Sequence, residues 1–304
     1  MYWKYDSSRR IAVGEVYMGN LIHWVFAVTG VIFIAELVVG RHRGIYSRND
    51  WFVNTICILF GLLLRPLSAA AIASVLAALL PQWKGALAGA PFLPSLIAIV
   101  LLGEFANYWV HRLSHQFKGA RHMDWLWRMH RTHHTGKYVN VLLNFRTSLF
   151  WTLVGGLSWV LALSLYLGLA LPAGFAVTLF MLWGIITHAD FRWDDAIRAH
   201  PRVGTAFRAM EHVLISPGVH HSHHGYGRDG GNFRNYGIML AIYDWMFGTL
   251  YIPKGRPFRY GIPGESPHWA DDAFAPMKPA EWTHGLRNGS RSHMQAEGAI
   301  DRQD

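Results

Sequence analysis

The stretch LPSLIAIVLLGEFANYWV, residues 93–110, is mainly apolar and runs directly into the histidine pair His111 and His115. As an α-helix it would be roughly 27 Å long, close to the thickness of the hydrocarbon core of a bilayer. Because the two histidines are four residues apart, they would lie on one face at the end of that helix. The stretch therefore predicts a membrane-spanning helix that ends in two metal-binding side chains.

Two further histidine clusters follow, HRTHH at 130–134 and HHSHH at 220–224. In each of them, the first, fourth and fifth positions lie near one face of a helix, whereas His221 points roughly 100° away from His220 and is left out. Three helix faces with two or three imidazoles each are what a polynuclear metal site requires. Imidazole suits iron, zinc, copper and nickel. The spacing gives eight candidate ligands: His111, His115, His130, His133, His134, His220, His223 and His224.

The composition is that of a membrane protein. Of 304 residues, 52% are hydrophobic and only 15% charged, against about 25% charged in a typical soluble domain. The net charge of +9 comes from Lys and Arg residues that border apolar runs, as juxtamembrane residues do, and we expect no nucleic-acid partner. The single cysteine, Cys57, excludes an intramolecular disulfide and argues against a thiolate-rich metal site.

Apolar segments mark the expected spans. Segment 52–81 contains Arg65-Pro66, so one kinked span and two short re-entrant legs both remain open. Segment 148–187 is interrupted at Leu171-Pro172, which predicts a membrane hairpin whose two ends lie on the same side of the membrane. All three clusters would therefore lie on one side of the membrane. We therefore expect an all-α integral membrane protein with four to six transmembrane or re-entrant helices and a cytosolic helical cap that carries the histidines.

This organisation predicts three regions. Residues 1–92 hold the N-terminal membrane helices, and we expect Met1–Asn20 to be a cytosolic lead-in that is not cleaved. Residues 93–262 form the histidine-bearing domain. Residues 263–304 form a polar tail that we expect to be partly disordered.

The clusters and their surroundings resemble the fatty acid hydroxylase/sterol desaturase superfamily of integral-membrane di-iron enzymes, over roughly residues 100–262. The stretches that carry the resemblance are EFANYWVHRLSH (104–115), WLWRMHRTHH (125–134), THAD (187–190), SPGVHHSHH (216–224), NYG (235–237) and DWMFGTLY (244–251). The resemblance implies two metal ions bound by eight or more histidines. It adds His188 as a further ligand, although the chain has His-Ala-Asp where relatives commonly have His-Ala-Asn. The chain departs from the family pattern after the second cluster, where the segment Asn144-Phe145-Arg146-Thr147 lacks the expected histidine.

Three polar residues upstream of the first cluster are candidate catalytic-site residues. Glu104 precedes His111 by seven residues and so lies on nearly the same helix face, where it could orient an imidazole N–H. Asn107 and Tyr108 share that face and could line the cavity. The roles of His122 and His212 stay open between ligand, support and surface.

The chemistry implied is the O2-dependent hydroxylation of a C–H bond in a membrane lipid. Such a bond offers no acid, leaving group or electrophile, so it requires a redox metal that activates O2. We expect two iron ions, which zinc could replace in a preparation. The chain has no haem, flavin, nicotinamide or iron–sulfur motif, so electrons must come from a separate reductase, ferredoxin or cytochrome b5-like carrier.

The sequence leaves several alternatives open. Desaturation would use the same site. A metal transporter or sensor, or a zinc-dependent hydrolase, would use the histidines differently. The lipid, the carbon attacked and the oligomeric state are not determined.

Overall fold

The computed structural model describes residues 7–231, 234–263 and 267–274, and its regular structure is mostly helical. The elements in chain order are α1 (Ser7–Val39), α2 (Arg48–Leu79), η1 (Pro81–Trp83), α3 (Phe92–Gln116), α4 (Asp124–His134), η2 (Val141–Phe145), α5 (Trp151–Val154), α6 (Gly156–Tyr166), α7 (Ala170–His188), α8 (Trp193–Ala199), α9 (Gly204–Met210), α10 (Pro217–His224), β1 (Gly225–Tyr226), α11 (Ile242–Met246), β2 (Arg259–Tyr260) and α12 (Trp269–Ala273). The two short strands pair antiparallel, Gly225 with Tyr260 and Tyr226 with Arg259.

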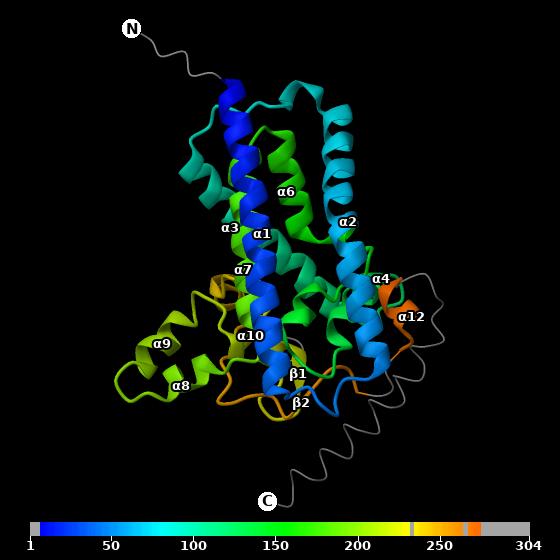
Figure 1. Cartoon of the computed structure of the whole chain (residues 1–304), viewed down its shortest axis with the longest axis vertical. Coiled ribbons are helices and arrows are strands. Elements are labelled where there is room, and N and C mark those ends of the chain that lie inside the picture. The colour runs from blue at the N-terminus through cyan, green and yellow to red at the C-terminus, as the bar shows by residue number, and fades with distance from the viewer. Residues whose placement is uncertain (1–6, 232–233, 264–266, 275–304) are drawn as a thin grey trace, which may run out of the picture.

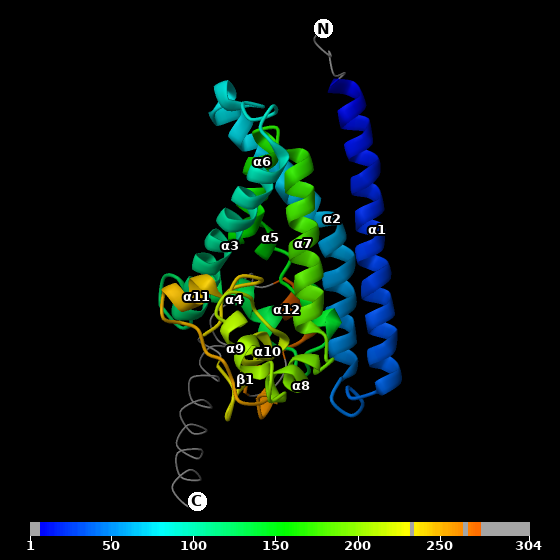
Figure 2. The ribbon, with the colours of Figure 1, turned by 90° about the vertical axis from the view of Figure 1, so that its left-hand side faces the viewer.

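Three of the described helices, α2, α3 and α7, are long and apolar enough to cross a membrane. The described apolar part of α1, His23–Val39, and helix α6 are shorter. The long helices run side by side along the long axis of the molecule, with α1 along one flank (Figures 1 and 2). The short helices α4 and α8–α12 gather toward one end, where α3 and α7 finish. The chain is thus an all-α protein with the features of a membrane protein.

Of the segment that the sequence left undecided, 52–81, all but the last two residues lie within the single helix α2. Pro66 lies inside α2, where it removes one backbone donor, but the helix continues on both sides. The helix starts at a capping box: the Ser47 hydroxyl accepts from the Asp50 backbone N–H, and the Asp50 carboxylate accepts from the Ser47 backbone N–H. Two re-entrant legs are therefore wrong for this segment.

The chain reverses between α6 and α7, within the expected hairpin segment, but earlier than Leu171-Pro172. Helix α6 ends at Tyr166, and the chain reverses through Gly168, whose φ of +88° favours glycine. Pro172 lies in the first turn of α7, where the missing N–H needs no helical partner. The first leg is also interrupted at Gly155, between α5 and α6.

Helices α3 and α6 approach closely at Gly156. A Cβ atom at this position would lie 2.2 Å from the carbonyl oxygen of Ala106 and 2.8 Å from the backbone N of Asn107. Backbone atoms cannot move aside as a flexible side chain can, so only glycine fits. This contact holds α6 against the helix that carries His111 and His115.

Substitution of Gly156 by alanine is therefore expected to destabilise the fold by about 1–3 kcal/mol, the usual cost of overpacking. Gly30→Ala in α1 makes the same chemical change where nothing lies within 4 Å of the new Cβ, and helix propensity makes it neutral or favourable. Thermal unfolding in detergent micelles measures both. Equal midpoints for the two variants would contradict the close contact.

Part of the predicted polar tail is structured. Helix α12 packs against α2 and α4, and the Leu149 N–H donates to the carbonyl of Ala273. Residues 264–266 and 275–304 of the tail lie outside the described residues.

Candidate metal centre

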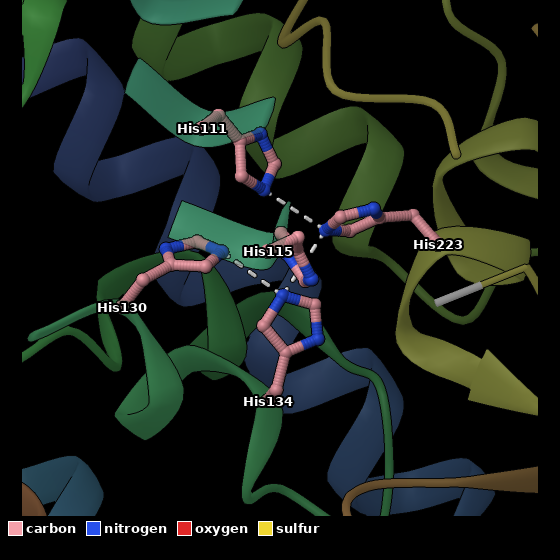
Figure 3. A group of neighbouring side chains, drawn as sticks. All are labelled: His111, His115, His130, His134 and His223. Atoms are coloured by element: carbon pink, nitrogen blue, oxygen red, sulfur yellow. Dashed lines mark hydrogen bonds between the residues drawn. The ribbon is translucent and has the colours of Figure 1, made fainter. Parts of the chain in front are cut away.

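The fold brings nine histidines together in two buried groups. The five-histidine group comprises His111, His115, His130, His134 and His223, and the four-histidine group comprises His133, His188, His220 and His224. Within each group the potential ligand atoms all lie within 4.8 Å of one another. Figure 3 shows the five-histidine group, with rings from three different helices turned toward a common centre.

Helices α4 and α10 each contribute to both groups. Consecutive residues on a helix point about 100° apart, so His133 and His134 face different groups, and so do His223 and His224. Helix α3 contributes only to the five-histidine group, and α7 contributes only His188 to the other. The sequence places these residues on shared faces but does not predict how they divide.

Backbone carbonyls fix the protonation of several rings. In the five-histidine group, the Nδ1–H of His111 donates to the carbonyl of Tyr236 at 2.7 Å, and that of His223 donates to the carbonyl of Arg234 at 2.8 Å. Because a carbonyl oxygen only accepts, Nδ1 carries the proton in both rings, and each neutral ring has a lone pair on Nε2. These two Nε2 atoms are 3.0 Å apart.

The same arrangement occurs in the four-histidine group. The Nδ1–H of His133 donates to the carbonyl of Arg146 at 3.2 Å, and that of His188 donates to the carbonyl of Gly184 at 2.7 Å. Their Nε2 atoms are 3.4 Å apart. Each group therefore contains two nitrogen lone pairs that face each other at close range, an arrangement that a cation between them would stabilise.

Burial keeps these imidazoles neutral. It lowers the pKa of His133 to about 4. Burial also lowers the pKa of the other five grouped histidines on α4 and α10 well below the ordinary value, and nearby histidines lower it further. These five are His130, His134, His220, His223 and His224. Neutral imidazole is the form that binds a metal.

The spacing of the nitrogens fits transition-metal ions. Ligands at right angles and roughly 2.1 Å from a common ion would be about 3.0 Å apart. In the five-histidine group, successive Nε2 atoms in the series His111, His223, His134 and His130 are 3.0 to 3.1 Å apart. In the four-histidine group, successive Nε2 atoms in the series His224, His220, His188 and His133 are 2.9 to 3.4 Å apart. An all-imidazole donor set suits iron, zinc, copper or nickel.

The structure places Glu104 differently from our expectation. Its fully buried carboxylate accepts from the backbone N–H groups of Ile238, at 2.5 Å, and Met239, at 3.1 Å, and not from an imidazole. The carboxylate of Asp244 accepts from the N–H groups of Tyr236 and Gly237. The two acids thus brace the loop whose Tyr236 carbonyl holds His111, so Glu104 reaches the ring only through the backbone.

Asn107 and Tyr108 are buried but are not joined to a histidine by any hydrogen bond among the described residues. The Tyr108 hydroxyl contacts Thr249 Oγ1 at 3.0 Å and accepts from Arg112. Asn107 lies where α6 crosses α3. Both therefore pack α3 against its neighbours.

Several of the described histidines lie outside both groups, among them His122, His212 and His221. His122 is exposed, and the ring of His212 packs against Trp245. His221 is buried but lies against Tyr260, with its Nδ1 3.3 Å from the hydroxyl. Asp190, in the His-Ala-Asp segment, accepts from Arg41 and from the Tyr138 hydroxyl.

Sequence reasoning missed the buried support of the second cluster. The Arg146 side chain is fully buried and contacts the carboxylates of Asp50 and Asp272 at 3.1 and 3.3 Å, while its carbonyl holds His133. The sequence shows this arginine in the segment Asn144-Phe145-Arg146-Thr147, which lacks the histidine that the family resemblance implies. Its two acidic partners lie 96 and 126 residues away, and no spacing rule connects them.

Comparisons with known proteins bear on this centre. A family model described as fatty acid hydroxylase matches residues 96–249, the part of the chain that contains all nine histidines. No solved structure matches the chain significantly.

Curated relatives are similar over about half to two thirds of the chain. An alkylglycerol monooxygenase from Danio rerio is 30% identical over 52% of this chain and 31% of its own length. An ornithine lipid hydroxylase from Rhizobium tropici is 30% identical over 52% of this chain and 42% of its own length. A methylsterol monooxygenase from Arabidopsis thaliana is 27% identical over 67% of this chain and 65% of its own length. The chain thus spans about a third of the length of the first of these relatives.

Proposed function

Since the chain belongs to the fatty acid hydroxylase family, we propose that it is a membrane oxidoreductase that hydroxylates a C–H bond of a lipid with O2, and that the nine histidines bind two iron ions. The observation that carries this proposal is the pair of facing Nε2 lone pairs in each histidine group. Burying two facing lone pairs costs free energy unless a cation lies between them. The oxidoreductase relatives supply the class of reaction.

Bound iron would supply the one-electron and O2 chemistry that an unactivated C–H bond requires. The overall reaction consumes the lipid, O2, two electrons and two protons, and it yields the hydroxylated lipid and water. The chain's part is to hold the donors: carbonyls of Arg146, Gly184, Arg234 and Tyr236 keep four rings in the tautomer that exposes Nε2. Burial of all nine rings excludes bulk water from the centre.

The position of the centre favours a lipid substrate. The histidines of α3 and α7 lie in the last turns of these two helices, both long enough to span a membrane. A lipid chain could thus reach the centre from the bilayer. We propose that this end of the molecule faces the cytosol, where a separate reductase, ferredoxin or cytochrome b5-like carrier delivers the electrons.

The same geometry argues against a transporter. Transporter sites lie near the bilayer midplane, on interrupted helices, whereas these ligands come from the ends of two long helices and from the short helices α4 and α10. Desaturation remains the close alternative, because the same centre could remove a second hydrogen and form a second water.

The test is turnover with isotope-labelled O2. The purified protein is loaded with Fe(II) without oxygen, mixed with membrane lipids and a reductant, and exposed to labelled O2. Mass spectrometry is expected to find a lipid that has gained one labelled oxygen atom, and removal of the iron with a chelator is expected to abolish it. A product lacking two hydrogens and any label would indicate desaturation. Turnover that survives both iron removal and anaerobiosis would overturn the oxygenase proposal.

A further inference from the structure

We propose that Arg146 is a positioning residue of the four-histidine group, and that two segments outside the family match, the start of α2 and helix α12, are needed to hold a metal there. This inference rests on the metal centre proposed above. It concerns how one of the two groups is kept in place.

Arg146 is anchored on several sides within the protein. Its Nη1 is 3.1 Å from an oxygen of Asp50, and its Nη2 is 3.3 Å from an oxygen of Asp272. Nη2 also donates to Thr135 Oγ1 at 2.9 Å, and Nε donates to the carbonyl of Thr132 at 3.2 Å. All these groups are buried. A guanidinium bound in this way has one orientation.

The anchored residue fixes His133 from two directions. The carbonyl of Arg146 accepts from the ring at Nδ1, and the side chain holds Thr132 and Thr135, which flank His133 and His134 at the end of α4. The position of His133 Nε2 therefore follows from the position of Arg146.

The two acidic partners of Arg146 lie on opposite sides of the family match in the sequence. Asp50 is in the first turn of α2, and Asp272 is in α12, whereas the family match covers only 96–249. Asn49 joins the start of α2 to the segment that begins α12. Its side chain donates to the carbonyl of Pro267 at 2.9 Å and accepts from the Trp269 N–H at 2.7 Å. The hydroxyl of Thr132 donates to the carbonyl of Asp272 at 2.6 Å.

The effect of this network is unequal for the two groups. The five-histidine group relies on His111 and His223, which are held by Tyr236 and Arg234, and it retains four rings even if His134 shifts. The four-histidine group would retain only three rings if His133 moved. Disturbing the network should therefore weaken one metal site much more than the other.

The experiment compares Asp272→Asn with Asp271→Asn. Asp271 is the neighbouring, partly exposed acid of α12, so its variant makes the same charge change away from Arg146. Full-length proteins in detergent are titrated with Fe(II) and, separately, with Co(II), whose absorption reports the coordination of each ion, and the bound metal is counted by mass spectrometry. We expect about two ions per chain in the wild type and in Asp271→Asn. In Asp272→Asn we expect one ion to bind as before and the second to bind about 10–100-fold more weakly, as is typical when an outer partner of a ligand is lost.

The outcomes separate this inference from the proposed function. A wild type that binds fewer than two ions would contradict the proposed centre itself. A wild type that binds two, with Asp272→Asn equal to it or weakened equally at both sites, would overturn the inference alone. If Asp272→Asn is not recovered folded, Asp50→Asn removes the carboxylate on the other side of Arg146 and is read by the same criteria. Asp272→Glu, which keeps the charge, is expected to recover part of the affinity of the second site.

Discussion

Replacing His223 with alanine is expected to reduce formation of hydroxylated lipid by more than about 100-fold, beyond the loss usual for outer partners of a metal site. His223 Nε2 lies 3.0 Å from that of His111 and 3.1 Å from that of His134, so it is central in the five-histidine group. Its loss leaves four rings in that group but removes the nitrogen between His111 and His134, so one iron per chain is expected to bind more weakly than in the wild type. Product is measured by lipid mass spectrometry and metal by elemental analysis.

The chain offers a matched control two residues earlier. His221 is buried on the same short helix but belongs to neither group, so His221→Ala removes a similar volume without removing a proposed ligand. Its metal content is expected to equal that of the wild type. Full metal content and turnover in His223→Ala would show that the ligand assignment is wrong.

The second large effect is on stability. Arg146→Leu is expected to lower the free energy of unfolding by about 3–5 kcal/mol, because it leaves the carboxylates of Asp50 and Asp272 buried without their cation. Asp272 keeps a contact with Arg131 at 3.2 Å, which only partly offsets the loss. Unfolding by SDS in mixed micelles measures the change.

A compensating variant tests the cause. If the penalty comes from unpaired charge, Arg146→Leu combined with Asp50→Leu and Asp272→Leu should recover much of the stability, as happens when a whole buried ion network is replaced by apolar residues. If the triple variant is as unstable as Arg146→Leu, unpaired charge is not the main cause, and the lost hydrogen bonds of Arg146 to Thr132 and Thr135 and of Asp50 in its capping box account for the change.

The sequence predicted much of this architecture because local signals were strong. Apolar length and helical histidine spacing predicted α3 with its two histidines, and Ser216-Pro217 predicted the start of α10, where the Ser216 hydroxyl caps the helix. All nine histidines that we singled out lie in the two groups. Their role as ligands stays a prediction.

What the sequence did not predict depends on distant contacts. The division of adjacent histidines between two groups follows from how helices surround α4 and α10, which periodicity does not encode. Glu104 accepts from residues 134 and 135 positions away, so its helix face alone suggested the wrong partner. Helix α12 lies in a polar segment without periodicity, and its order comes from packing and from the pairing of Asp272 with Arg146.

The contribution of α4 and α10 to both groups has a consequence for the distance between the two proposed ions. In two pairs of sequence neighbours, His133 with His134 and His223 with His224, each group receives one member. The covalent backbone between the two members of each pair therefore limits how far apart the two groups can lie. Repacking the long helices to accept a different lipid would leave this interval unchanged. A single-residue insertion within either pair would destroy it, however well the remaining protein folded.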